Sequence, residues 1–204
     1  MSLPTPYYAD DAVTIYHGDC RDILPLVEFD SILTDPPYGI QLNFGDGSSD
    51  TQGAFIENCE WLAGQDRPTA FTVPATKIHD CPRPQWVGVW HKPMTFGFWS
   101  TPLIPHWEPV LFYGMTEKAK RSDVWTFNPE KPNGHPTPKP LDLWKSLITI
   151  LPGVVLDPFA GSGTTGRVAK DLGRKAILIE IEERYCEIAA KRMAQTVLPL
   201  GGIA

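Results

Sequence analysis

The sequence predicts an α/β fold in which a mostly parallel sheet is covered by helices on both faces. Strand-like and helix-like segments alternate along most of the chain, a pattern typical of parallel sheets with crossover helices. One strand runs into a glycine-rich turn that opens a helix. The chain has 204 residues, of which 42% are hydrophobic, and this suits one domain over 1–204 with a substantial core.

The elements of the first half are short and end at turn residues. A β-rich alternating segment precedes a short helix that Pro25 interrupts, and an apolar run then stops at Asp35. Apolar residues at helical spacing follow and end at Gly64, before another strand. In order, the expected elements are a strand at 12–19, a helix within 20–28, a strand at 29–35, a helix at 50–64 and a strand at 69–73.

The second half ends in a regular alternation of helices and strands. Pro140 suits the first turn of a helix, because the missing N–H is not needed there. The last helix is amphipathic, and its apolar side carries Tyr185, Ile188, Ala189 and Met193. The expected elements are strands at 86–90 and 109–114, a helix at 140–151, a strand at 153–159, a helix at 163–173, a strand at 175–181 and a helix at 182–197.

Composition argues against membrane, metal and disulfide roles. No apolar run approaches the roughly 18 residues that a membrane span needs, and the N-terminus lacks the pattern of a signal peptide. The four cysteines are scattered without a CxxC pair, so we expect reduced thiols, no metal and a cytoplasmic location. Cys81 precedes a proline but has no supporting motif, so a nucleophilic cysteine is not expected.

Charge is unevenly distributed, although the net charge is −6. Residues 1–75 carry 2 basic and 12 acidic side chains, whereas 76–145 carry 9 basic and 6 acidic ones. The second segment also contains four of the five histidines and most of the tryptophans, which suits phosphate attraction and base stacking. We therefore consider 82–133 a candidate recognition region; a loop-rich subdomain with core tryptophans is the alternative. Its dense basic cluster is Lys118, Lys120 and Arg121.

The glycine-rich turn is the strongest indication of a cofactor. Gly161, Gly163 and Gly166 fit a G-x-G-x-x-G pattern, which lets the backbone approach a ligand at a helix N-terminus. Glu180 lies 19 residues after Gly161, at the end of the next strand, where a carboxylate can accept from ribose hydroxyls. A dinucleotide is therefore admissible. Asp157 before the turn would nevertheless suit the cationic amino group of S-adenosylmethionine better than a pyrophosphate.

Five motifs together resemble the β-group amino-methyltransferases of DNA, which methylate exocyclic nitrogens. DPPYG at 35–39 is similar to their catalytic motif, and LDPFAGSGTTGRVA at 156–169 is similar to their cofactor motif. YHGDCRDIL, GHPTPKPLDLWKSLI and ILIEIEERYCEIAAKR resemble three further segments of that group. The catalytic motif comes first, which is the circularly permuted order. The resemblance implies a Rossmann-like methyltransferase fold with a small loop-rich insertion.

The same resemblance implies catalytic roles for Asp35, Pro36, Pro37 and Tyr38. Asp35 and the Pro36 carbonyl would accept hydrogen bonds from the target amine, and Pro37 would restrict where that carbonyl points. Tyr38 would stack on a base that has been flipped out of the duplex. These roles explain why so stiff and polar a segment follows a strand.

S-adenosylmethionine is the cofactor that the resemblance implies. Asp19 would accept from the adenine amino group, Glu180 would hold the ribose, and Ile181 would press on the adenine. The remaining residues would surround the methionine part of the cofactor. They are His135, Thr137, Lys139, Asp157, Phe159, Gly161, Ser162, Gly163, Thr164 and Thr165.

We therefore expect methylation of adenine N6 in DNA, because Asp at the first motif position more often accompanies adenine in this family. Cytosine N4 stays open, as do RNA or protein substrates and a DNA-binding module without activity. A nicotinamide oxidoreductase would use the same glycines but leaves the DPPY and HPTPKP segments unexplained. The small recognition region would suit a short target, relaxed specificity or a second subunit such as a homodimer partner. Its compactness would fit a phage or bacterial enzyme.

Overall fold

The computed structural model describes residues 2–39, 51–94, 103–116, 120–130 and 139–195. Within these ranges, nine strands form one sheet in the order β1-β2-β9-β8-β3-β4-β6-β5-β7. Five neighbouring pairs are parallel and three are antiparallel. The sheet is therefore mostly parallel, as the sequence predicts.

The centre of the sheet is built from parallel strands of buried residues. β3 (Ser31–Thr34) is buried at every position and lies between β8 (Val155–Asp157) and β4 (Thr69–Thr72). Uninterrupted burial of this kind is typical of strands that are covered on both faces. The other strands are β1 (Tyr8–Ala9), β2 (Val13–His17), β5 (Trp86–His91), β6 (Trp107–Tyr113), β7 (Val124–Thr126) and β9 (Ala176–Glu180).

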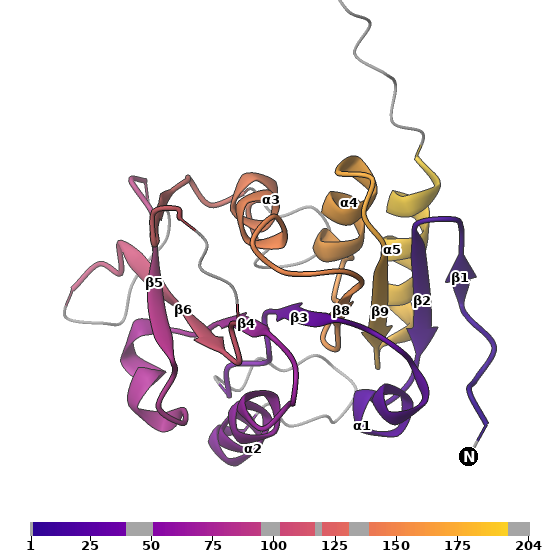
Figure 1. The fold of residues 1–204 in the computed structure, drawn as a ribbon, viewed down its shortest axis with the longest axis horizontal. Helices are drawn as coiled ribbons and strands as arrows, with labels where there is room; N and C mark the ends of the chain where they lie inside the picture. Colours follow the sequence, from indigo (N-terminus) through magenta and orange to yellow (C-terminus); the bar gives the residue numbers. More distant parts are fainter. Residues whose placement is uncertain (1, 40–50, 95–102, 117–119, 131–138, 196–204) are drawn as a thin grey trace, which may run out of the picture.

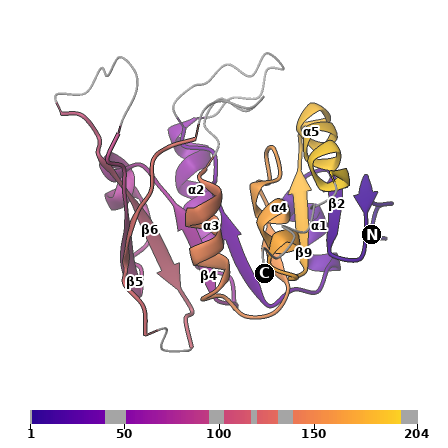
Figure 2. The same ribbon diagram turned by 90° about the horizontal axis from the view of Figure 1, so that it is seen from above.

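Helices cover both faces of the sheet (Figure 1). One face carries α3 (Leu141–Ile148), α4 (Thr164–Asp171) and α5 (Glu183–Ala194). The other face carries α1 (Cys20–Ile23) and α2 (Gln52–Ala63). Figure 2 shows α3, α4 and α5 following one another along the sheet, from the β4 side toward β2. Two short 3₁₀ segments, η1 (Leu24–Leu26) and η2 (Ala75–Asp80), complete the described elements.

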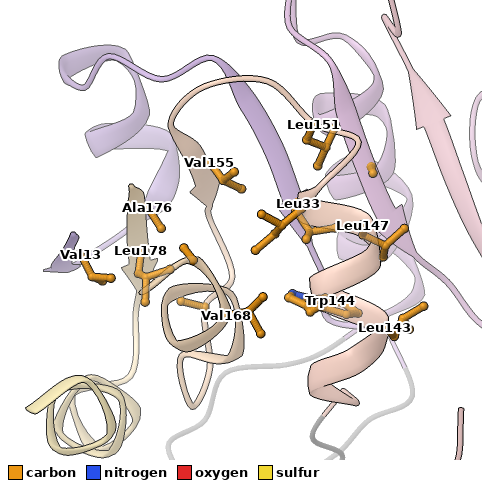
Figure 3. Packing of buried hydrophobic residues seen from close by; sticks show 14 of the residues in the cluster. Val13, Leu33, Leu143, Trp144, Leu147, Leu151, Val155, Val168, Ala176 and Leu178 are labelled. Atoms are coloured by element: carbon orange, nitrogen blue, oxygen red, sulfur yellow. The ribbon is translucent and has the colours of Figure 1, made fainter. Parts of the chain in front are cut away.

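Two hydrophobic clusters fill the space on either side of the sheet. In the cluster drawn in Figure 3, Trp144 of α3 and Val168 of α4 point toward each other near Leu33 of β3. All three side chains are at most 2% exposed. Trp144 Nε1 also donates to Thr165 Oγ1 at 2.8 Å, so the residue that packs α3 against α4 also fixes the first turn of α4.

Glycine shapes the start of α4. Gly163 precedes the helix with a φ of 78°, a left-handed conformation that favours glycine, and a Cβ there would lie 2.9 Å from Ala189 Cβ. Gly166 lies so close to the sheet that a Cβ would be 2.7 Å from Leu178 Cδ1. These glycines therefore permit both the turn and the tight packing of the helix that follows it.

The predicted fold class is confirmed, and each expected strand and helix has a counterpart. β1 and β7 have no counterpart in the sequence-based prediction, because two and three residues are too few to show a period. In α5, Cys186 is fully buried whereas Ile188 is half-buried, which corrects the predicted apolar side. β5, β6 and β7 lie within 82–133, so this region contributes strands to the sheet. Its part in target recognition stays a prediction.

All four cysteines are free thiols in this structure. Cys59 on α2 and Cys81 lie with their Sγ atoms 3.0 Å apart, although 22 positions separate them in the chain. In the part of the chain that the structure describes, helices of the length and hydrophobicity needed to cross a membrane are absent.

Candidate active site

The carboxyl ends of β2, β9, β8, β3 and β4 meet at one edge of the sheet. β3 and β8 are neighbours, but β3 connects onward to β4 on one side and β8 to β9 on the other. Such a topological switch point is where open α/β sheets bind ligands. Asp35 follows β3 and Asp157 ends β8, and Thr34 Oγ1 donates to Asp157 Oδ1 at 2.6 Å. The DPPY motif and the glycine turn therefore lie at one candidate site.

Asp35 has both carboxylate oxygens engaged. Its Oδ2 lies 2.8 Å from Lys139 Nζ, and its Oδ1 accepts hydrogen bonds from the hydroxyls of Tyr38 and Thr72. The side chain is 22% exposed, so part of the carboxylate faces solvent. Pro36, next in the chain, is buried, and Pro37 is exposed. Asp35 is thus a fixed hydrogen-bond acceptor at the rim of the site.

Lys139 is a buried cation beside the DPPY motif. Its ammonium lies 2.8 Å from Asp35 Oδ2, donates to Tyr38 Oη at 2.8 Å and lies 3.5 Å from Glu108 Oε2. Burial lowers the pKa of Lys139, but the carboxylates of Asp35 and Glu108 outweigh it, and the pKa is raised overall. The sequence-based prediction places Lys139 against the cofactor. In the structure, its ammonium contacts Asp35 and Tyr38 of the DPPY motif.

Tyr38 is held in the site by its ring and its hydroxyl. The ring packs edge-on against Phe55 of α2, with centroids 6.4 Å apart. The hydroxyl donates to Asp35 Oδ1 and lies 3.3 Å from Thr72 Oγ1. Burial and the charges of Asp35 and Glu108 raise the pKa of Tyr38 well above its ordinary value, so the phenol keeps its proton. A target amine that used Asp35 Oδ1 as acceptor would therefore replace this hydroxyl.

Asp157 is a buried carboxylate at the start of the glycine turn. Oδ1 accepts from Thr34 Oγ1 at 2.6 Å and from the Phe159 amide at 3.1 Å, and Oδ2 accepts from Thr165 Oγ1 at 2.5 Å. Burial raises the pKa of Asp157 from 3.8 to about 6, because the hydrogen bonds compensate only in part. A cationic group bound beside this carboxylate would favour its ionised form.

Glu180, at the end of β9, braces the glycine turn. Its Oε2 accepts from the Gly161 amide at 2.7 Å, and its Oε1 accepts from the Glu182 amide at 2.9 Å. Burial raises the pKa of Glu180, and these backbone hydrogen bonds oppose the rise. The carboxylate thus ties the turn to β9, and its contact with ribose hydroxyls stays a prediction.

The hydroxyl side chains of the turn form bonds within the protein. Thr164 Oγ1 accepts from Arg192 Nη1 at 3.2 Å, and the Ser162 carbonyl lies 3.4 Å from the same nitrogen. Arg192 belongs to α5, so it fastens the start of α4 to the last helix. Thr165 donates to Asp157, as described above. Contact between these hydroxyls and a cofactor stays a prediction.

Three further predicted residues lie at the same edge. Asp19 precedes α1 and caps it, because its Oδ1 accepts from the Arg21 amide at 2.8 Å. Phe159 packs edge-on against Trp61, with centroids 6.3 Å apart. Ile181 is 62% exposed, which leaves an apolar surface beside the end of β9.

Some predicted residues do not come to this edge. Arg121 is exposed, and its Nη1 donates to Thr149 Oγ1 at 2.9 Å, at the end of α3 opposite to Lys139. Lys120, beside it, is also exposed, and DNA contact by either residue stays a prediction. The described ranges hold no cluster of three or more His, Cys, Asp or Glu side chains that suits a metal ion. His135, Thr137 and Lys118 lie outside the described residues.

Three polar residues of the site are missing from the predicted set. Thr72 ends β4 and donates to Asp35, and Lys92 Nζ lies 2.5 Å from Glu108 Oε1. A charged or polar side chain within or just after an apolar strand is the one sequence signal that marks them. That signal does not show that they approach Asp35, because Thr72 lies 37 positions away in the chain.

A family model described as DNA methylase, of the N6/N4 methyltransferase type, matches residues 89–191. The match spans half of the chain and runs from β5 through the glycine turn into α5. The chain belongs to this family. The predicted resemblance to DNA amino-methyltransferases is thereby confirmed, and the alternative of a nicotinamide oxidoreductase is not supported.

The chain is also similar to individual DNA methyltransferases. The type II methyltransferase M2.DpnII of Streptococcus pneumoniae is 42% identical over 91 residues, which are 41% of this chain and 34% of that protein. The chain thus spans about a third of that relative's length. The crystal structure of an M1.HpyAVI–SAM complex covers 88% of this chain and 99% of that chain, with 27% identity and a TM-score of 0.64. The match to the cytosine-N4-specific PvuII DNA methyltransferase covers 95% of this chain and 90% of that chain, with 18% identity and a TM-score of 0.71. This likeness shows a shared fold.

Proposed function

We propose that this protein transfers a methyl group from S-adenosylmethionine to N6 of an adenine that is flipped out of DNA. The junction of β3 and β8 carries the proposal, because Thr34 Oγ1 donates to Asp157 Oδ1 at 2.6 Å. This hydrogen bond holds the Asp35 loop beside the glycine turn. A methyl donor at the turn and an amine at Asp35 would then be adjacent, and such proximity is a large part of the rate enhancement in group transfer.

The glycine turn fits a cationic nucleoside cofactor. The buried Asp157 carboxylate would pair with the amino group of the methionine part, which would favour the ionised form of a side chain with a pKa of about 6. Glu180 would accept from the ribose hydroxyls, and the exposed Ile181 would lie against the adenine. S-adenosylmethionine supplies the activated methyl group. The SAM complex of M1.HpyAVI supports this assignment.

The Asp35 loop would activate the target amine by positioning and charge. An exocyclic amine is a poor nucleophile because its lone pair is delocalised into the ring. Acceptors on both amine hydrogens favour a tetrahedral nitrogen, and Asp35 Oδ1 and the Pro36 carbonyl are the acceptors that we propose. The Tyr38 hydroxyl bonds to Oδ1 in this structure, and its displacement would leave the ring available to stack on the base. No covalent enzyme intermediate is required.

Adenine is proposed rather than cytosine because Asp35 occupies the first position of the motif. Residues 82–133 are proposed as a reduced target-recognition region, with β5, β6 and β7 at the end of the sheet. A homodimer partner would supplement so small a region. DNA as the substrate would place the activity in the cytoplasm of a bacterium or of a phage-infected cell.

Transfer of labelled methyl from S-adenosylmethionine to unmethylated DNA, followed by nucleoside analysis, tests the proposal. The wild type should form N6-methyladenine, and Asp35→Asn should not. Asp11→Asn is the matched control, because Asp11 is an exposed carboxylate between β1 and β2. N4-methylcytosine would correct the base. Label that appears in RNA or protein but not in DNA would refute the proposed substrate.

A further inference from the structure

Four charged side chains alternate in sign from the edge of the sheet to the catalytic loop. Lys92 Nζ lies 2.5 Å from Glu108 Oε1, and Glu108 Oε2 lies 3.5 Å from Lys139 Nζ. Lys139 Nζ in turn lies 2.8 Å from Asp35 Oδ2. Glu108 and Lys92 touch neither the DPPY motif nor the glycine turn in these contacts. They reach the catalytic carboxylate only through Lys139.

The sheet register explains why these groups meet. Trp90 of β5 pairs with Glu108 of β6, and Lys92 follows two positions after Trp90, so the three side chains share one face. Lys139, just before α3, extends over the same face, with its ammonium 5.9 Å from the Trp90 ring centroid. Lys92 lies 4.5 Å from that centroid. The indole thus forms a common floor beneath both ammonium groups.

The burial of these charges makes their pairing obligatory. Lys92 and Lys139 are 8% and 7% exposed, and the Glu108 side chain is 15% exposed. Within the described ranges, Glu108 Oε2 is buried without a hydrogen bond, and the ammonium of Lys139 is its charged partner there, at 3.5 Å. A buried pair of this kind adds little net stability compared with apolar residues of similar size. Its effect here is to fix where the Lys139 ammonium stands.

We propose that Glu108 and Lys92 are positioning residues for the methyl transfer proposed above, on which this inference rests. Glu108, itself held by Lys92, keeps the Lys139 ammonium on Asp35 Oδ2. With Oδ2 fixed, the Asp35 carboxylate presents Oδ1 to the target amine. Without Glu108, the ammonium has one carboxylate partner fewer, and the Asp35 carboxylate is held less firmly.

The protonation of Lys139 provides a readout that a purely structural role would not move. Burial lowers the pKa of Lys139, whereas Asp35 and Glu108 raise it and prevail. Among the described residues, the titratable groups that face this ammonium are Asp35 and Tyr38 from the loop after β3 and Glu108 from β6. Lys92 lies behind Glu108. Loss of the Glu108 charge should therefore lower the pKa of Lys139. The alkaline limb of the pH–rate profile should move to lower pH.

Steady-state methylation of DNA by Glu108→Gln tests the inference. We expect kcat to fall about 10- to 100-fold, as for a misplaced reacting group, with KM for S-adenosylmethionine within about twofold of the wild type. Glu108→Asp should recover part of the loss and part of the alkaline limb. Lys170→Met is the control, because it removes a partly buried ion pair, Lys170–Asp10 at 2.5 Å, outside the site. Its kcat and pH profile should match those of the wild type.

Lys92→Met is a second variant, which leaves Glu108, Lys139 and Asp35 in place. It should lower kcat in the same direction while the thermal shift caused by S-adenosylmethionine is retained. If the wild type is active and Glu108→Gln has the same kcat and the same alkaline limb, this inference is wrong but the proposed function stands. Loss of the fold in both Glu108→Gln and Lys92→Met would also overturn the inference, because it would show that Glu108 and Lys92 have a structural role. An inactive wild type would refute the proposed function and, with it, the inference.

Discussion

Replacement of Asp157 by asparagine should stabilise the cofactor-free protein and weaken its binding of S-adenosylmethionine. The side chain is 4% exposed, and burial raises its pKa from 3.8 to about 6. The folded protein therefore holds this proton more tightly than the unfolded chain does. The resulting contribution to stability is complete below the unfolded pKa of 3.8 and is lost as the pH rises through about 6. Asparagine has no charge to bury and avoids that loss.

The size of the effect follows from the two pKa values. A tenfold change in proton affinity is about 1.4 kcal/mol, so pKa values of 3.8 and about 6 differ by roughly 3 kcal/mol. The asparagine carbonyl can still accept from Thr34 and the Phe159 amide, and Thr165 can accept from its NH₂ group. We expect a gain of about 2–3 kcal/mol at neutral pH, or roughly 5–10 °C in Tm for a chain of this size. Near pH 4.5 the gain should shrink to about 1 kcal/mol.

Thermal unfolding from pH 4.5 to 7.5, with and without S-adenosylmethionine, measures both effects. The wild type should gain Tm from the cofactor, because a cationic amino group favours the ionised carboxylate, and the variant should gain far less. Asp11→Asn, at an exposed position, should show no such pH-dependent difference. A variant that is no more stable than the wild type at pH 7.5 would refute the burial argument. Undiminished cofactor binding would refute the proposed place of the amino group.

Three other changes test neighbouring parts of the structure. Asp35→Asn should lower kcat by about 100-fold or more, because it removes the charged acceptor that we propose for the target amine. The Tm gain from S-adenosylmethionine should be retained. Loss of both the activity and this Tm gain would point to a cofactor role for Asp35 instead. Gly163→Ala should lower the free energy of unfolding by about 1–3 kcal/mol, measured by urea denaturation, because φ is 78° and the new Cβ would lie 2.9 Å from Ala189 Cβ. An unchanged midpoint would contradict that geometry. Mild oxidation should link Cys59 to Cys81, whose Sγ atoms are 3.0 Å apart, and peptide mass analysis that finds another pairing would contradict the observed contact.

Local patterns in the sequence were sufficient to predict most of the fold. The strand before Asp157, the three glycines and the helix after them follow one another within about 16 positions, so steric and capping preferences act between near neighbours. The same holds for α2, which Gly64 ends, and for α3, which Pro140 begins. β1 and β7 escape prediction because such short strands exist only through pairing with a longer neighbour.

The candidate active site was predicted in part for the same reason. DPPY and the glycine turn are contiguous motifs, so their residue types show the chemistry that each can support. The sequence by itself therefore determined the α/β class of the fold, and its resemblance to DNA amino-methyltransferases supplied the two motifs of one candidate site. Asp35 and Asp157 are the carboxylates that it predicts for those motifs.

Only the tertiary structure decided which distant side chains complete the site. Lys139 donates to Tyr38 across 101 positions of chain, and Thr72 reaches Asp35 across 37. Glu108 and Lys92 come together through the register of two antiparallel strands, which no local pattern encodes. These contacts depend on how strand ends and a helix start pack against one another, and burial then requires each charge to find a partner. The residue types of the two motifs indicate the chemistry, and the tertiary packing determines which other side chains hold the motif residues in place.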